Sequence, residues 1–252
     1  MKNFLYIAIL LAAGLTACDQ DIDYPYQGKD RIHFKHYTLD NNRVRTYYTE
    51  KTYSMGFLDD EIKQETIKIP VELLGKVSDV DRTYQVAIIS KSTNAVEGVH
   101  YEPFSMTQTL EAGAISDTLR IVVNRDELST SFRNPVDIYL DLEIIPTDDF
   151  DIGLVGGASM KIVLNNYLSE PLWWTAPGVW FGALDYYHPL KWKILISFNE
   201  KFANYDKSPF GSNDADGKVY SAGLSTYLNE NVVVDYETNE RLYMTYTVPY
   251  NP

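Results

Sequence analysis

Two stretches of the chain alternate between apolar and polar residues, and this pattern constrains the fold more than any other feature. In residues 66–73, and again in residues 136–144, every second residue is Ile, Val or Leu. A period of two is typical of a β-strand with one face on a core and the other in water. Because Pro70 cannot donate a backbone hydrogen bond, we expect the first of these strands to lie at the edge of a sheet.

Further strands are predicted to begin near Arg31, Thr83, Asp117 and Ser159, with turn-rich stretches of Gly, Asp and Asn between them. This number of half-buried strands predicts an antiparallel β-sandwich in a mainly β chain. The chain contains one cysteine and so has no disulfide framework. Its stability must therefore come from the burial of a hydrophobic core.

The most specific pattern lies in residues 81–123. A strand leads to a Ser-Thr-x-Ala turn, then to Glu-Gly-x-His-Tyr, then to a turn that ends at Gly113, and then to another strand. Gly98 and Gly113 suit backbone angles that side chains disfavour, and Tyr101 is expected to insert its ring into the sandwich. The pattern resembles the core of Calx-beta-type sandwiches, with His100 where an aspartate is common, and this resemblance implies that the antiparallel β-sandwich is immunoglobulin-like. This difference argues against calcium binding there.

The N-terminus predicts export and lipidation. Residues 4–17 are apolar and follow Lys2, but they are fewer than the ~20 residues of a membrane span, so residues 1–17 read as a signal peptide. The last four residues up to Cys18 resemble a bacterial lipobox, in which Cys18 is acylated and becomes the mature N-terminus. Cys18 is then a membrane anchor rather than a catalyst, the alternative being an ordinary thiol.

Three acids, Asp19, Asp21 and Asp23, follow in a lipidated linker of residues 18–30. They resemble the export signal of surface lipoproteins of Bacteroidota, although a solvated acidic linker would have the same composition. We therefore expect a protein anchored in the outer membrane and facing the cell exterior. The formal net charge of −13 argues against nucleic acid as a partner.

A longer series of segments resembles one family. The segments, in order, are VELLGKVSDVDRTYQVAI, STNAVEGVHYE, LEAGAISDTLRIVV, DDFDIGL and LSEPLWW. The same order is found in uncharacterised lipoproteins that are encoded in Bacteroidota polysaccharide-utilisation loci, beside outer-membrane transporters and glycan-binding lipoproteins. The resemblance implies a sandwich, here residues 31–167, followed by a smaller domain, and it provides no catalytic residues.

The smaller domain, residues 168–252, is expected to be a mixed α/β subdomain rich in aromatic residues. All four tryptophans lie in it. Residues 217–231 predict a helix, with Asp216 as its cap and Val219, Leu224, Tyr227 and Leu228 on one face. Residues 190–203 fit either a helix or a strand.

The aromatic side chains of this subdomain suggest a sugar-binding platform made of Trp173, Trp174, Trp180, Tyr186 and Tyr187. Flat rings stack on the apolar faces of pyranoses, although tryptophan is more often a core residue. Two adjacent residues of a strand point to opposite faces, so one indole of the Trp173–Trp174 pair is expected to face solvent.

Metal and catalytic sites have less support. Asp148, Asp149 and Asp151 could provide oxygen ligands for calcium, but aspartate is also common in turns. His33 and His36 are three residues apart, which on a strand places them on opposite faces. The chain has no recognised nucleophile, phosphate-binding or zinc-protease motif, so we expect neither a cofactor nor catalysis.

These observations predict a non-enzymatic accessory of a polysaccharide-uptake system, which binds glycan or docks on the outer-membrane transporter complex and its glycan-binding lipoproteins. The alternative is a structural or adhesive envelope lipoprotein without sugar binding. The exposure of the tryptophans distinguishes the two: a solvent-facing row favours sugar, and buried indoles favour a spacer.

Overall fold

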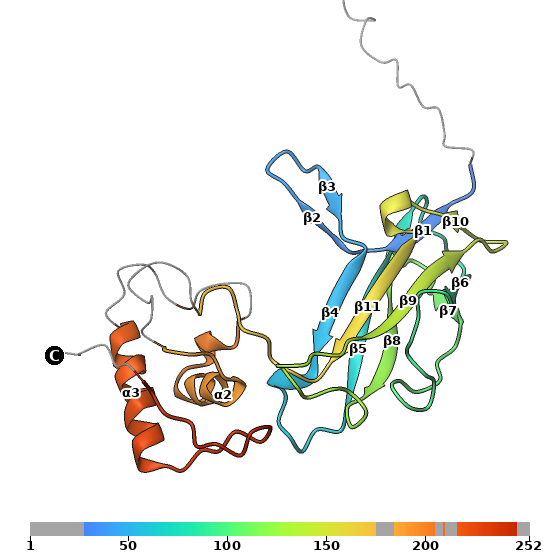
Figure 1. Cartoon of the computed structure of the whole chain (residues 1–252). Coiled ribbons are helices and arrows are strands. Elements are labelled where there is room, and N and C mark those ends of the chain that lie inside the picture. The colour runs from blue at the N-terminus through green and yellow to red at the C-terminus, as the bar shows by residue number, and fades with distance from the viewer. Residues whose placement is uncertain (1–27, 175–183, 205–208, 210–215, 246–252) are drawn as a thin grey trace, which may run out of the picture.

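A computed structural model describes residues 28–174, 184–204, 209 and 216–245 (Figure 1). Most of the chain forms two packed β-sheets, and a smaller helical part follows. The first sheet has the order β10-β1-β5-β8, with β10 (Asp151–Ile152), β1 (Arg31–Phe34), β5 (Gln64–Leu74) and β8 (Ser116–Asn124). The predicted mainly β chain, with a sandwich followed by a smaller part, is confirmed.

The second sheet has the order β4-β11-β9-β6-β7. Its strands are β4 (Glu50–Ser54), β11 (Ser159–Asn165), β9 (Ile138–Ile145), β6 (Arg82–Ile88) and β7 (Thr107–Leu110). A separate hairpin of β2 (Tyr37–Leu39) and β3 (Arg45–Tyr47) projects beside the sandwich (Figure 1). Two short 3-10 turns, η2 (Met55–Phe57) and η3 (Val155–Gly157), follow β4 and β10.

The alternating pattern forms the sandwich core as expected. Ile67, Ile69, Val71 and Leu73 of β5 are all buried, and Leu140, Leu142 and Ile144 of β9 face them from the second sheet. The pattern began too early in the second case, because Val136 precedes β9 and is 56% exposed. Gly98 and Gly113 have φ of 76° and 78°, and the ring of Tyr101 is buried, as predicted.

The prediction that Pro70 marks an edge strand is wrong, since β5 lies between β1 and β8. The Pro70 carbonyl accepts a hydrogen bond from Lys35 N, just past the end of β1. The backbone nitrogen of a strand residue points to the same side as its carbonyl. The missing donor therefore faces away from β8, and the β5–β8 ladder remains complete.

The sandwich is also not purely antiparallel. β10 pairs with β1, and β4 pairs with β11, in parallel. Both parallel partners come from segments far apart in sequence, which no local pattern could have matched. As a result β4, an early strand, lies at an outer edge of the second sheet.

The C-terminal part has its own hydrophobic cluster around Trp192, Leu195 and Phe202. Residues 190–203 form helix α2 (Pro189–Phe198) and a 3-10 turn, η4 (Glu200–Phe202), rather than a strand. His188 caps α2, because its Nδ1 accepts a hydrogen bond from Leu190 N at 3.1 Å.

Helix α3 (Asp216–Glu230) forms where it was predicted, with Leu224 and Leu228 buried. Val219 and Tyr227, assigned to the same face, are instead 42% and 37% exposed. Within the described ranges, neither helix is long and apolar enough to cross a membrane.

Candidate functional site

The Trp173–Trp174 pair lies in a turn and is buried, so the prediction that one indole faces solvent is wrong. Trp174 N donates to Pro171 O, closing the turn, and the side chains are 7% and 1% exposed. A turn does not send neighbouring residues to opposite faces, as a strand would. The two indole N–H groups donate to the carbonyls of Asn204 and Asp185, at 2.8 and 3.0 Å.

The remaining platform residues do not form an open row either. Tyr187 is half-buried and packs edge-on against Trp174 at 5.0 Å, and its hydroxyl donates to Leu168 O. Tyr186 is 38% exposed, but the ammonium of Lys191 covers one face of its ring at 3.3 Å. Trp180 lies outside the described residues, as does Cys18.

The aspartates proposed as calcium ligands do not converge. Asp149 Oδ2 accepts hydrogen bonds from both the backbone N and the hydroxyl of Thr83. Asp151 lies in β10, and Asp148 precedes Asp149 in the turn before it. The parts of the chain that the structure describes contain no group of three or more His, Cys, Asp or Glu side chains suited to a metal ion.

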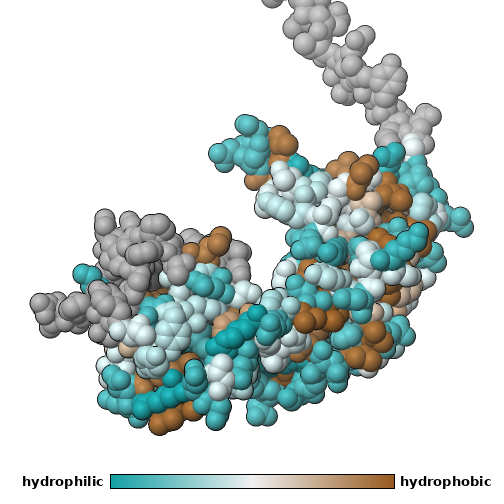
Figure 2. All heavy atoms as spheres, in the orientation of Figure 1, coloured by the Kyte–Doolittle hydropathy of each residue, from teal (hydrophilic) through white to brown (hydrophobic). Residues whose placement is uncertain are grey.

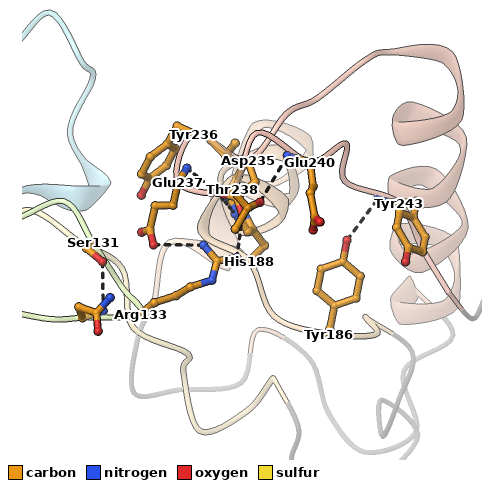
Figure 3. A network of polar contacts seen from close by, with 12 residues as sticks. Ser131, Arg133, Tyr186, His188, Asp235, Tyr236, Glu237, Thr238, Glu240 and Tyr243 are labelled. Atoms are coloured by element: carbon orange, nitrogen blue, oxygen red, sulfur yellow. Dashed lines mark hydrogen bonds and ion pairs between the residues drawn. The ribbon is translucent and has the colours of Figure 1, made fainter.

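A charged network instead joins the sandwich to the C-terminal part (Figure 3). Arg133, from the loop between β8 and β9, forms ion pairs with Asp235 at 2.6 Å and Glu237 at 3.2 Å. Tyr236 adds a hydrogen bond to Thr130 O at 2.9 Å. The network therefore fixes the segment after α3 against the sandwich.

The electrostatics of this network suit a structural clamp. Burial opposes ionisation of Asp235, yet its hydrogen bonds from Arg133, Glu237 N and Thr238 hold the pKa of the carboxyl well below its usual range. Burial lowers the pKa of His188, although Asp235 opposes this. His188 Nε2 lies 3.5 Å from Asp235 Oδ1, and both side chains are inaccessible to solvent. The pair could not reach a substrate.

A groove beside the C-terminal part is open to solvent (Figure 2). It has a volume of about 1020 Å³ and follows β4. Figure 2 shows the surface hollowed between the β2–β3 hairpin and the C-terminal part. His36 and Tyr48 lie at the hairpin end of the groove, and Phe57 and Leu168 lie at the other end.

The groove surrounds the outer edge of β4. Thr52 and Ser54 are in register with Val163 and Asn165 of β11, so these side chains share the outer face of the sheet. Lys51 and Tyr53 point to the inner face, toward Ile67 of β5. An occupant of the groove would thus meet a polar surface on one side and a more apolar one on the other.

A polar cluster forms the outer wall of the groove. Asp137 Oδ1 accepts hydrogen bonds from the Tyr167 hydroxyl at 2.6 Å and from Asn165 Nδ2 at 3.2 Å. Asn165 is 6% exposed, and its Oδ1 has no hydrogen-bond partner among the described residues. Buried polar atoms are nearly always paired, so an orphaned acceptor at the wall of a groove indicates a missing donor.

Sequence reasoning missed this site. The β4 sequence, Glu-Lys-Thr-Tyr-Ser, has no aliphatic residue, so it lacks the alternation that identified the other strands. Asp137 lies just before β9, and its neighbours Asn165 and Tyr167 come from β11 and the segment after it.

Residues 26–201 match the domain of unknown function DUF4843, which is more than half of the chain. The chain belongs to the DUF4843 family. All residues that line the groove of this DUF4843 chain fall within the matched range, whereas Asp235 of the clamp lies beyond it. No curated protein matches the chain.

The DUF4843 chain is also similar to solved structures. The apo form of the Calx CBD1 domain aligns with 55% of this chain and 98% of its own, at 11% identity and a TM-score of 0.36. A proposed carbohydrate binding protein from Bacteroides ovatus ATCC 8483 aligns with 55% of this chain, at 11% identity and a TM-score of 0.37. A multidomain protein including DUF1735, from Bacteroides ovatus, aligns with 56%, at 18% identity and a TM-score of 0.34. The DUF4843 chain spans 37% and 45% of the lengths of these last two.

Proposed function

We propose that this DUF4843 protein is a non-enzymatic surface lipoprotein that docks a protein partner of a polysaccharide-uptake system in the groove along β4. The lipobox-like segment before Cys18 supports membrane anchoring, and the acids after it support export to the cell surface. The family resemblance supports an outer-membrane transporter, or a glycan-binding lipoprotein beside it, as the partner.

The groove is the observation that carries this proposal. Its volume of about 1020 Å³ is at the upper limit of small-molecule pockets, which favours a larger, extended occupant. It lies within the family's matched range, and the clamp behind it holds its two flanking parts together. Trp173 and Trp174 of the expected sugar platform are buried, which argues against that platform and would also suit a spacer, so the groove itself is what favours docking.

Glycan binding remains a second candidate because of two aromatic side chains in the groove. Tyr48 is 46% exposed at the hairpin end, and Phe57 is 37% exposed at the other. Rings at both ends of a groove could stack on separate residues of a polysaccharide.

Co-purification from native outer membranes tests the docking proposal. The full-length protein, tagged at its C-terminus and extracted in mild detergent, should be recovered with the transporter or its glycan-binding lipoprotein in near-equal amounts. Recovery of the tagged protein alone would contradict docking. Affinity electrophoresis of the same preparation through polysaccharide gels tests the second candidate: retardation that Tyr48→Ala abolishes would favour glycan.

A further inference from the structure

The backbone of β4 presents unused hydrogen-bonding groups to the groove. Lys161 N donates to Thr49 O at 2.8 Å, which fixes the direction of the parallel ladder between β4 and β11. Backbone groups alternate in direction along a strand, so those of Lys51 and Tyr53 also point toward β11. The N–H and C=O groups of Glu50 and Thr52 therefore point away from the sheet, where no described strand pairs with them.

The walls of the groove match the two faces of an added strand. Successive side chains of such a strand would point alternately to the polar wall of Thr52, Ser54 and Asn165 and to the inner wall of Tyr53 and Ile67. A polysaccharide has no regular row of alternating N–H and C=O groups, whereas a peptide repeats them every two residues. The free edge thus matches a polypeptide better than a sugar.

The charged residues that line the groove favour an occupant with a basic side chain. Three carboxylates and one ammonium, that of Lys51, line the groove: Glu50 is paired with Lys161 at 3.2 Å, which leaves Glu65 and Asp137 without a described cationic partner. Burial lowers the pKa of His36, so this residue adds no charge at neutral pH. Asp137 Oδ2 accepts no hydrogen bond from the described residues, and Asn165 Oδ1 also lacks a donor.

We propose that β4 receives an extended segment of the partner protein as an added strand, with a Lys or Arg side chain of that segment at Asp137 and Asn165. This inference rests on the proposed docking function and names its site and its ligand chemistry. Backbone hydrogen bonds to Glu50 and Thr52 give affinity, and the basic side chain gives specificity. The charged residues Glu50 and Lys51 meanwhile disfavour pairing between the β4 edges of two copies.

Two variants of one residue separate strand addition from ordinary surface contact. Thr52→Pro removes the outward N–H without affecting the ladder to β11, while Thr52→Ala removes only the side chain and is the matched control. The probe is an array of random octapeptides, with full-length protein purified in detergent. We expect the bound peptides to carry Lys or Arg, and Thr52→Pro, which loses both the side chain and the N–H, to bind about tenfold more weakly than Thr52→Ala, which keeps the N–H.

A second pair of variants and an exchange measurement guard against misfolding of Thr52→Pro. Asp137→Asn should weaken binding of the basic peptides about tenfold, and Asp126→Asn, at an exposed site outside the groove, should not. Bound peptide should slow amide hydrogen exchange within residues 50–54. Equal binding by the Pro and Ala variants, unchanged exchange, peptides without basic residues, or dimerisation through β4 would each overturn the proposal.

In native membranes, the same variants distinguish failure of strand addition at β4 from failure of the docking function. If the wild-type protein co-purifies with its partner and Thr52→Pro does not, both proposals stand. If both co-purify equally, docking stands but uses another surface. If the wild-type protein is recovered alone, the docking function itself fails.

Discussion

Single buried residues affect how the stability of this protein depends on pH, and Lys191 is the clearest case. Its side chain is fully buried in α2, where Nζ donates to Tyr186 O at 3.1 Å and lies 3.8 Å from Asp185. Burial lowers the pKa of Lys191 to about 8, and Asp185 opposes this only in part. The charged ammonium of Lys191 is therefore unfavourable in the folded state, despite its contacts with Tyr186 and Asp185.

This lysine predicts a pH-dependent stability. The unfolded state binds its proton up to about pH 10.4, so between about pH 8 and 10.4 unfolding takes up a proton, and the contribution of Lys191 to stability rises with pH. Urea unfolding of the wild type and Lys191→Met from pH 7 to 10 should show the difference changing in favour of the wild type, by up to about 3 kcal/mol. Parallel profiles would contradict this, and Lys201→Met, at an exposed site, is the control.

His100 shows how a histidine can close a turn in which an aspartate would also fit. Its Nδ1 accepts a hydrogen bond from Val96 N at 2.9 Å, within the turn that contains Gly98. An aspartate oxygen could accept the same bond. The imidazole therefore preserves the turn without a carboxylate.

At the scale of elements, glycines show which contacts are tight and which are open. A Cβ on Gly157 of η3 would lie 2.8 Å from the ring of His33 and 2.9 Å from Phe34 O. A Cβ on Gly223 of α3 would make only an ordinary contact with the Phe198 ring at 3.6 Å. The two glycines thus have different structural roles.

The same substitution should therefore have opposite effects at the two sites. Gly223→Ala should stabilise the protein by about 0.8 kcal/mol, because alanine favours the helix. Gly157→Ala should destabilise it by about 1–3 kcal/mol, because the backbone carbonyl of Phe34 cannot move away easily. Chemical denaturation measures both, and a destabilising Gly223→Ala would show that α3 is packed more closely than described.

The elements also show what sequence can and cannot predict. Strands such as β5 and β9 were identified because one face is aliphatic and the other polar. β4 was missed because its inward residues, Lys51 and Tyr53, are amphipathic and line an open groove rather than a closed core. The buried tryptophans were misjudged because their exposure depends on a turn whose packing partners lie elsewhere in the chain.

The candidate site was the least predictable part for a physical reason. The groove exists because no described strand covers the outer edge of β4, and the absence of a neighbouring strand leaves no pattern in the sequence. Asp137 and Asn165 are brought together by antiparallel pairing of β9 and β11 just beyond the last paired residues. Their spacing in sequence carries no motif.

For the whole molecule, the clamp of Arg133 and Asp235 determines how firmly the two parts hold together. Arg133→Ala would leave the buried Asp235 without its cationic partner, which costs about 3–5 kcal/mol in fully buried pairs. Arg133 is 39% exposed, so we expect about 2 kcal/mol. Faster hydrogen exchange in residues 233–242 together with residues 129–134 would show a loosened junction.

The pH dependence of the clamp gives an independent check. The pKa of Asp235 is lowered in the folded state, so its stabilising contribution is complete above the unfolded value of about 3.9 and decreases as the pH falls further. Arg133→Ala should lose part of this acid sensitivity. If unfolding between pH 5 and 2 follows the same curve in the variant and the wild type, Arg133 is not what holds Asp235 ionised.

The parallel pairing of early with late strands also affects how the chain folds. Arg31 pairs with Asp151, and Glu50 pairs with Lys161, so each of these two parallel ladders joins residues that are more than a hundred positions apart in the sequence. Such high contact order slows folding, because the entropy of closing a long loop is lost before the contacts between its ends can stabilise the chain. During synthesis β1 can pair early with β5, but β4 has no partner strand until β11 has been made, and folding intermediates with open edges are prone to aggregate. The outer edge of β4, which pairs with no described strand in the finished molecule, is thus also open from the beginning of synthesis, so this strand is exposed to aggregation for as long as the chain is being made.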